Sequence, residues 1–215
     1  MRALAINGSP RKNQNTAKLL QAALDGAAGK GTETELIHLY ELQYKGCVSC
    51  FACKRKDRPH GHCVMRDELA PVLQKAYDAE ILILGSPIYY MNITSGMAAF
   101  LERLLYPNTI YSREIPSVFP RRKAVGFLYT MNMRQEQMAP FGMDSNLRTY
   151  QNSLGTIFHD KPEILYACNT YQFSDYEKYE SSMFSESEKA AYREEQFPKD
   201  LEAAFEMGKR LAGSV

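Results

Sequence analysis

The feature that most constrains the fold of this 215-residue chain is a regular alternation of short apolar segments with amphipathic ones. The apolar segments predict five strands, at residues 3–6, 33–39, 80–87, 124–129 and 163–168. The amphipathic segments predict helices at 16–28, 67–76, 95–105, 147–154 and 187–211, the last of them kinked or divided by Pro198. This alternation predicts an α/β fold with three layers, a doubly wound five-stranded parallel sheet covered by helices on both faces.

Three connecting loops should meet at one edge of this sheet. They span residues 7–16, 86–94 and 130–143, and all three are rich in polar or aromatic side chains. Ligands of open parallel sheets bind outside the carboxyl ends of the strands, where the strand order reverses. We therefore expect a ligand site formed by these loops.

The first of these loops has the composition of an anion site. A strand stops at residue 7 and a helix starts near residue 16, so free N–H groups and the positive end of the helix dipole should face the loop. The side chains that add donors or charge are Ser9, Arg11, Asn15 and Thr16. An ordinary strand–helix turn with a good N-cap is the alternative. The loop lacks both G-x-G-x-x-G and G-K-[ST], which favours a single terminal phosphate over a dinucleotide or P-loop nucleotide.

Length and composition are those of an ordinary globular protein. We expect one domain over residues 1–215, since this length can bury a substantial core. A formal net charge of +1 gives no steering toward nucleic acid or membrane, and we expect neither as a partner. No apolar run in the sequence is long enough to span a bilayer, and the N-terminal residues do not resemble a signal peptide. We expect a cytoplasmic protein.

Four of the five cysteines fall in one polar segment, residues 46–63, which we expect to be a long irregular excursion from the sheet. Cys47, Cys50 and Cys53 have the C-x2-C-x2-C spacing of [4Fe–4S] ferredoxins, and Cys63 follows after residues 54–62. Three interpretations stay open: a cluster bound by these four cysteines, a set of free thiols, and a zinc or thiol-redox site that includes a histidine. The fifth cysteine, Cys168, ends a strand and is expected in the core.

Two motifs resemble a known family. Residues 8–11 read Gly-Ser-Pro-Arg and are followed by Asn15-Thr16, while residues 85–92 read Gly-Ser-Pro-Ile-Tyr-Tyr-Met-Asn. Together they resemble the flavodoxin-like NAD(P)H-dependent FMN reductases, and within that group the branch that contains the iron–sulfur flavoproteins. The resemblance extends to about residue 130 and implies the flavodoxin-like strand order 2-1-3-4-5.

The resemblance also implies the cofactor and its binding residues. The FMN phosphate would be held by Ser9, Arg11, Asn15 and Thr16. The isoalloxazine edge would be wrapped by Pro87, Ile88, Tyr89, Tyr90, Met91 and Asn92, with Thr130 and Asn132 near its pyrimidine side. A flavin needs flat apolar walls and few charges, which suits this tyrosine-rich loop. We expect no catalytic side chain, since the cofactor carries the chemistry.

The resemblance finally implies a reaction. We expect an oxidoreductase that passes reducing equivalents from NAD(P)H through FMN to a small acceptor such as a quinone, a flavin or a nitro compound, as a homodimer or homotetramer. The alternative is an iron–sulfur flavoprotein electron carrier with a [4Fe–4S] cluster on segment 46–63. Iron–sulfur flavoproteins close their cysteine motif with a shorter gap, and related FMN reductases keep cysteines without a cluster, so we favour free thiols and no metal. Residues from about 171 form a C-terminal extension, either a partner-facing flap or a surface-packed tail.

Overall fold

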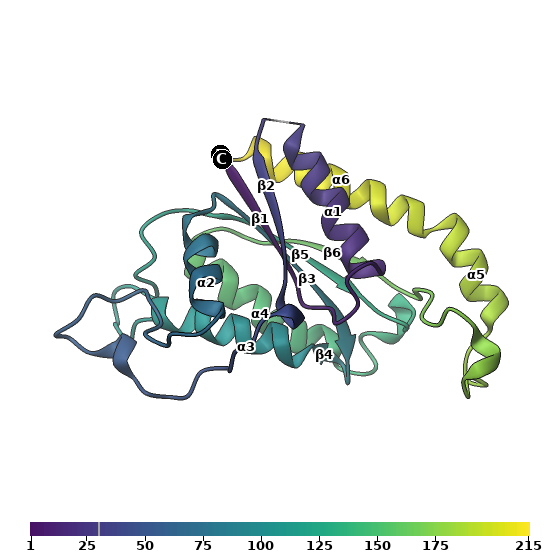
Figure 1. The fold of residues 1–215 in the computed structure, drawn as a ribbon, viewed down its shortest axis with the longest axis horizontal. Coiled ribbons are helices and arrows are strands. Elements are labelled where there is room, and N and C mark those ends of the chain that lie inside the picture. The colour runs from purple at the N-terminus through teal and green to yellow at the C-terminus, as the bar shows by residue number, and fades with distance from the viewer. Residues whose placement is uncertain (30) are drawn as a thin grey trace.

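A five-stranded parallel sheet forms the centre of the protein, whose computed structural model describes residues 1–29 and 31–215 (Figure 1). The strands are β1 (Arg2–Asn7), β2 (Glu33–His38), β3 (Ile81–Tyr89), β5 (Ala124–Thr130) and β6 (Glu163–Ala167), in the spatial order β2-β1-β3-β5-β6. Counted along the chain this is the predicted order 2-1-3-4-5, so the doubly wound α/β fold is confirmed. The sequence did not predict β4 (Asn92–Ile93), which pairs antiparallel with the end of β3.

Helices cover both faces of this sheet (Figure 1). On one face lie α1 (Asn15–Ala28) and α6 (Phe197–Gly213), and on the other lie α2 (Leu69–Asp78), α3 (Ser95–Leu105) and α4 (Met143–Phe158). Alternate residues of β1 enter two separate cores: Ala3 and Ala5 join the first, and Leu4 and Ile6 join the second. Because both faces are buried, these strands read as continuous apolar runs in the sequence.

The predicted helices differ from the observed ones by two residues or fewer at each end, except for one. The helix predicted at 147–154 extends over 143–158, and the prediction stopped before Gly155, a weak helix former inside α4. The helix predicted at 187–211 is divided into α5 (Glu186–Glu195) and α6, with Pro198 in the first turn of α6, where its missing N–H costs nothing. The division that Pro198 predicted is therefore confirmed.

The two helices on one face approach each other backbone to backbone. A Cβ atom at Gly208 of α6 would lie 1.8 Å from the carbonyl oxygen of Ala23, and one at Gly26 of α1 would lie 2.0 Å from that of Phe205. Only glycine fits at these two positions. The C-terminal helix is thus fixed against the first helix, and it carries α5 toward the carboxyl ends of the strands.

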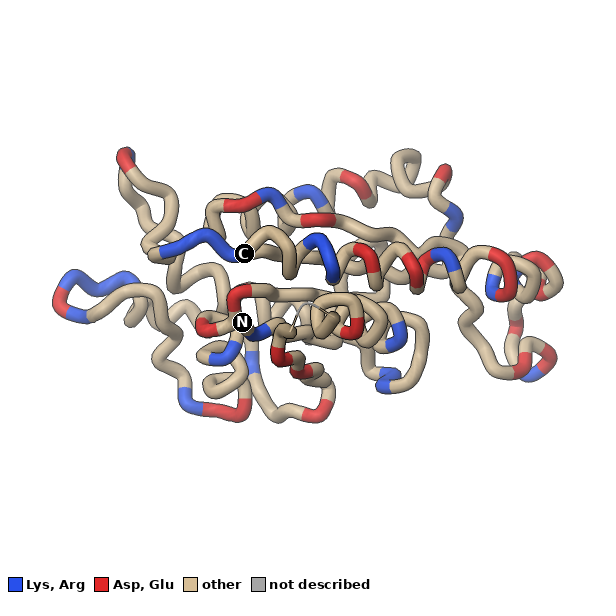
Figure 2. The backbone as a smooth tube through the Cα atoms, turned by 90° about the horizontal axis from the view of Figure 1, so that it is seen from above, with Lys and Arg blue, Asp and Glu red and all other residues tan. Residues whose placement is uncertain are grey.

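The segment 46–63 is irregular except for one short 3-10 helix, as predicted. The short 3-10 helices are η1 (Leu39–Glu41), η2 (Ala52–Lys54), η3 (Tyr106–Asn108), η4 (Gln135–Gln137) and η5 (Tyr176–Lys178). Figure 2 shows charges of both signs interspersed along the C-terminal helices, in keeping with the net charge of +1. Among the described residues, none of the helices combines the length and apolarity that crossing a bilayer requires.

Candidate functional site

The loop after β1 is organised by its own side chains. The backbone N–H of Ser9 donates to Asn7 Oδ1 at 2.9 Å, and the N–H of Arg11 donates to Ser9 Oγ at 3.1 Å. The N–H of Gly8 donates to the carbonyl of Gly85 at the end of β3. Asn7 and Ser9 are both buried. The loop is therefore a fixed structure, joined to the neighbouring strand end before any ligand binds.

This loop leads into a helix start that suits an anion. Within residues 1–29, which the structure describes, the N-cap residue Gln14 makes no side-chain capping bond, and the first turn of α1 contains no acidic residue. The first N–H groups of α1 and the positive end of its dipole are thus available to a negative ligand. Arg11 adds a positive charge next to them.

Three of the four predicted phosphate residues contact two remote parts of the chain. Arg11 Nη1 donates to the carbonyl of Gln172 at 2.7 Å, and Asn15 Nδ2 donates to that of Tyr171 at 3.0 Å. The buried hydroxyl of Thr16 lies 2.8 Å from the hydroxyl of Thr130 at the end of β5. The segment after β6 therefore passes over the predicted phosphate loop, a feature for which the sequence carried no signal.

The loop after β3 is a strained hairpin turn. β3 and β4 are joined by Tyr90 and Met91, both with positive φ, at 48° and 61°. Such turns normally use asparagine or glycine, because larger side chains are strained in this conformation. Tyr90 is 100 % exposed, and Asn146 of α4 donates to the carbonyl of Met91 at 3.2 Å. Strain of this kind is a frequent property of ligand-binding loops.

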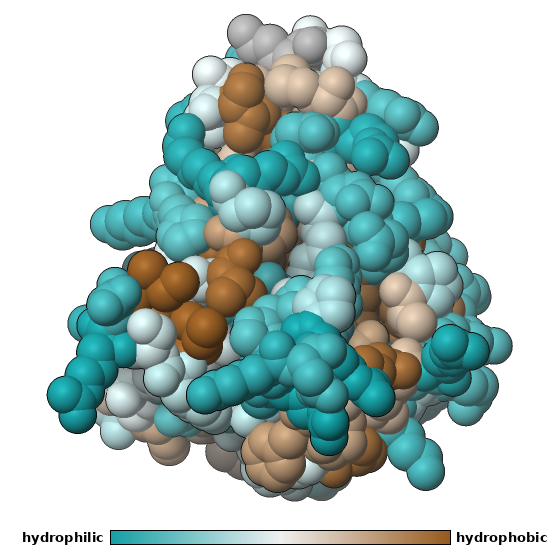
Figure 3. Space-filling view, turned by 90° about the vertical axis from the view of Figure 1, so that its left-hand side faces the viewer, coloured by the Kyte–Doolittle hydropathy of each residue, from teal (hydrophilic) through white to brown (hydrophobic). Residues whose placement is uncertain are grey.

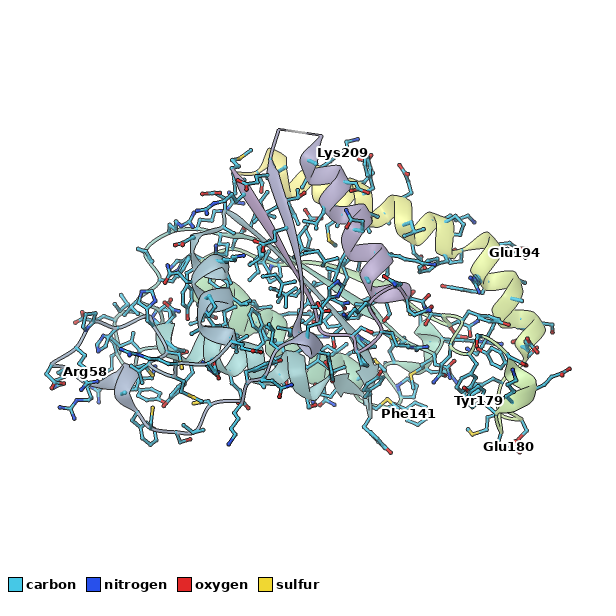
Figure 4. All side chains as sticks on the ribbon, viewed as in Figure 1. Arg58, Phe141, Tyr179, Glu180, Glu194 and Lys209 are labelled. Carbon is cyan, nitrogen blue, oxygen red and sulfur yellow. The ribbon has the colours of Figure 1, made fainter. Side chains whose placement is uncertain are left out.

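A cavity of about 700 Å³ lies beside this hairpin, at the carboxyl ends of β3, β5 and β6. Three residues of the predicted flavin wall, Ile88, Tyr90 and Met91, line it, whereas Pro87, Tyr89 and Asn92 are not among its described lining residues. Further walls come from residues 131–134, from Phe141 and Met143, and from residues 183–185. Figure 4 shows Phe141 at this end of the molecule, toward Tyr179 of the C-terminal extension. The cavity is thus mainly apolar and partly aromatic.

Two polar side chains stand out in this cavity. Asn132 Oδ1 is buried and has no hydrogen-bond partner among the described residues. Lys189 of α5 is only 2 % exposed, and its ammonium donates to the carbonyl of Asn132 at 3.1 Å and to Asn169 Oδ1 at 2.8 Å. Burial lowers the pKa of Lys189 to about 8, which leaves it mostly protonated at pH 7. Sequence reasoning named Asn132 but missed Lys189, which looked like one charge on a solvated helix face.

These features together fit FMN. The α1 start accepts a phosphate, Met131 of the cavity wall directly follows the Thr130 that bonds to the phosphate loop, and the apolar walls accept a flat ring. The unpaired Asn132 Oδ1 is an acceptor of the kind that a flavin N3–H requires. We conclude that the residues present form a suitable FMN site, although only part of the predicted ring-binding loop lines the cavity.

The four clustered cysteines line a second, small cavity together with Glu102 and Arg103 of α3. Arg103 is fully buried and forms a bidentate pair with Asp67, at 2.5 and 3.0 Å, yet its Nε has no partner among the described residues. Across residues 1–29 and 31–215, no three side chains of His, Cys, Asp and Glu are close enough to hold one metal ion. The cysteines are therefore gathered around one space without being in contact as ligands of a single ion.

The two sites lie toward opposite ends of the molecule. Figure 4 shows Arg58 of the cysteine segment far from Phe141 of the apolar cavity, and the two cavities share none of their described lining residues. Figure 3 faces the cysteine end, where apolar surface is visible, and Val48, Phe51 and Val64 of that segment are about half exposed. A third and wider groove of about 970 Å³, next to α3 and α4, includes Cys47 but none of the predicted flavin residues.

The fold and the loop site define a flavodoxin-like α/β protein built to hold a phosphorylated, flat ligand. The sequence profile of the NADPH-dependent FMN reductase family matches residues 1–149, and the chain belongs to this family. An iron–sulfur flavoprotein of Archaeoglobus fulgidus is 37 % identical over 105 residues, which are 49 % of this chain and 46 % of that protein. One of Methanocaldococcus jannaschii is 32 % identical over 126 residues, 59 % of each chain. The chain thus spans about half the length of the curated relatives it matches.

Solved structures share the fold at low sequence identity. An NAD(P)H:quinone oxidoreductase from Methanothermobacter marburgensis superimposes with a TM-score of 0.69 over 98 % of both chains, at 13 % identity. An FMN-dependent NADH-azoreductase from Bacillus anthracis, solved in complex with FMN, gives a TM-score of 0.68 over 98 % of this chain and 99 % of that one, at 12 % identity. These likenesses support the flavodoxin-like fold throughout the chain.

Proposed function

We propose that this protein binds FMN and uses it to pass reducing equivalents from NAD(P)H to a small, flat acceptor. The observation that carries the proposal is the cavity at the carboxyl ends of the strands, whose wall residue Met131 directly follows the Thr130 that bonds to Thr16 of the phosphate loop. FMN, when bound, supplies reversible hydride acceptance, which is why no acidic or basic side chain has to act in the reaction. Family membership and the names of the structural neighbours agree with this class of reaction.

The roles of the side chains follow from their positions. Arg11 and the start of α1 bind the phosphate, and the Thr16–Thr130 pair keeps the loop at the correct distance from the ring wall. Ile88 and Met91 exclude water from one side of the ring. Tyr90 and Phe141 are exposed and line the same cavity, so they offer flat surfaces on which a nicotinamide or an aromatic acceptor can stack.

A spectrum of the purified protein tests this function. We expect FMN to co-purify or to bind on addition, with absorbance of an oxidised flavin that bleaches when NADH or NADPH is added without oxygen. Addition of a quinone should then restore the absorbance. A colourless protein that takes up no FMN would refute the proposal, and bound FMN that neither pyridine nucleotide bleaches would refute the reductase activity.

The variant Met91→Asp provides a structural control for the same experiment. It places a charge on the cavity wall while leaving the phosphate loop intact, so we expect weaker FMN binding with an unchanged unfolding temperature, since Met91 lies in a partly exposed turn. The matched control is Met183→Asp, because Met183 lines the same cavity but is almost fully exposed.

The second candidate function is that of an electron carrier with FMN and a [4Fe–4S] cluster. It is favoured by the four cysteines around one cavity and by the buried Arg103 beside them, whose Nε has no hydrogen-bond partner within the described part of the chain. A cubane binds each thiolate at a different iron, so its cysteines need not be as close as the ligands of a single ion. The relatives that match this chain are named iron–sulfur flavoproteins, which agrees with this candidate.

Anaerobic purification separates the two candidates. Broad absorbance near 400 nm with about four iron and four sulfide per chain would establish the carrier, and loss of both in Cys50→Ser but not in Cys168→Ser would identify the ligands. A flavin spectrum free of iron, in anaerobically prepared protein, would leave the reductase as the function and the four cysteines as free thiols.

A further inference from the structure

The C-terminal helix α5 brings a buried positive charge to the predicted flavin cavity. Lys189 is one of two lysines that are almost completely buried among the described residues; the other, Lys123, binds the carbonyl groups at the end of α2 and lies far from the cavity in sequence and in the fold. A charged side chain is seldom buried without a partner of opposite charge. The ammonium of Lys189 instead has two neutral oxygen partners, so its charge remains uncompensated by an acid in contact with it.

The partners of Lys189 place it on the polar side of the cavity. One is the backbone carbonyl of Asn132, at 3.1 Å, and the side chain of this same residue holds the buried, unpaired Oδ1. The other is Asn169 Oδ1, at 2.8 Å, on a residue whose φ of 49° shows a backbone held in an unusual conformation. These two hydrogen bonds use two of the three N–H donors of the ammonium, which also lies 5.1 Å from the centroid of the Phe184 ring.

This pair of groups complements one edge of a flavin. The pyrimidine edge presents the N3–H donor between two carbonyl oxygens, so an unpaired acceptor with a cation beside it matches that edge in kind and in order. Apolar walls for the rest of the ring come from Ile88, Met91 and Met131, while the second cation that lines the cavity, Arg134, is paired with Glu188.

We propose that Lys189 lies beside the pyrimidine edge of the bound flavin and stabilises the negative charge that the ring acquires on reduction. The inference rests on the proposed FMN function and adds a residue outside the part of the chain that the family profile matches. A hydride from NAD(P)H brings two electrons and one proton, so the nicotinamide becomes a cation and the ring gains one negative charge at its N1–C2=O edge. A positive charge near this edge favours the reduced form over the oxidised one.

The midpoint potential of bound FMN tests the proposal directly. An opposite charge within a few ångströms shifts an ionisation equilibrium by tenfold or more. We therefore expect the ratio of reduced-FMN to oxidised-FMN affinity to fall about tenfold in Lys189→Met and in Lys189→Gln. This ratio corresponds to a fall of about 30 mV in the two-electron potential, measured anaerobically by equilibration with a reference dye. Lys189→Arg retains the charge and is expected to retain the potential.

Matched controls separate this role from a structural one. Lys178→Met removes a lysine of the same extension whose side chain is 75 % exposed, and its potential should equal that of the wild type. Oxidised-FMN affinity and unfolding temperature are measured for every variant. An unchanged potential in a neutral Lys189 variant that binds FMN would overturn the inference while leaving the FMN function intact. Failure of both neutral variants to fold would show that Lys189 has a structural role, and it would overturn the inference as well. Failure of the wild type to bind FMN would overturn both this inference and the proposed FMN function.

Discussion

Replacement of Arg11 by methionine tests whether the first loop recognises a phosphate. Arg11 is exposed, and its only described side-chain hydrogen bond is the one from Nη1 to the carbonyl of Gln172, at 2.7 Å. The guanidinium is charged in either contact, so exchanging the carbonyl for a phosphate replaces a neutral acceptor with an anionic one. Arginine–phosphate pairs are charge-assisted on both sides and commonly bidentate, so the net gain is about 1–2 kcal/mol. Arg11→Met should therefore weaken FMN binding by about 5- to 30-fold.

The assay compares FMN with riboflavin, which lacks the phosphate. Titration of each into the protein, followed by quenching of flavin fluorescence, gives the two dissociation constants. We expect Arg11→Met to lose affinity for FMN and to bind riboflavin like the wild type. The matched control is Lys12→Met, which removes the neighbouring charge, since Lys12 pairs with Glu41 instead.

Two results would refute this reasoning. An equal loss of FMN and riboflavin affinity in Arg11→Met would mean that the arginine acts on the ring or on the fold. A loss in Lys12→Met as large as that in Arg11→Met would mean that general positive charge, and no specific contact, attracts the ligand. An exposed contact of this kind should leave the unfolding temperature almost unchanged.

Three further predictions concern stability and the thiols. Gly208→Ala should destabilise the protein by about 3 kcal/mol in urea denaturation, because its Cβ would overlap a carbonyl oxygen of α1. The control Gly213→Ala has open space around it and should leave the stability unchanged. Equal effects of the two variants would contradict the close packing of the helices. Burial raises the pKa of Asp67, but the hydrogen bonds and charge of Arg103 outweigh this and hold it below its usual value. The pair therefore stabilises the protein above about pH 4, the pKa of Asp67 in the unfolded chain, and this stability is lost as the pH falls through the lower pKa of the folded state. Acid should thus destabilise the wild type more than Asp67→Asn, and parallel curves of stability against pH would contradict this. In the metal-free protein, the exposed Cys50 should react with a thiol reagent in the folded state, and Cys168 only after unfolding, because burial raises the pKa of Cys168 to about 11. Similar labelling rates of the two cysteines, measured by mass spectrometry, would contradict this.

Most of the fold could be predicted because its signals are local. The apolar run that became β3 and the stripe that became α3 each lie within a few turns of sequence, and α3 has the predicted bounds. The hairpin strand β4 was missed because Tyr90 and Met91 are not residues of a typical two-residue turn. The C-terminal end of α4 was missed because Gly155, a weak helix former, interrupts the helix pattern before the buried Ile157 and Phe158.

The candidate site could be predicted in part. The phosphate loop and the loop after β3 follow strands in sequence, and parallel strands bring their carboxyl ends to the same edge, so their proximity follows from the fold class. The choice of lining residues did not follow from it. Ile88 lines the cavity but Tyr89 does not, because successive side chains of a strand point to opposite faces, and the sequence alone did not show which face of β3 borders the cavity.

The sequence by itself determined the doubly wound sheet, the two ligand loops and the family, because each rests on neighbouring residues whose spacing has a physical meaning. Only the tertiary structure decided which remote residues complete the site. Gln172 lies over the phosphate loop because the chain after β6 is bonded to the segment after β5, through the N–H groups of Asn169 and Thr170. Lys189 reaches the ring cavity from α5, and the following helix α6 is packed against α1 through Gly26 and Gly208. A charged amphipathic helix reads as a solvated surface in sequence, and packing alone turns one of its lysines into a buried cation beside a proposed flavin site.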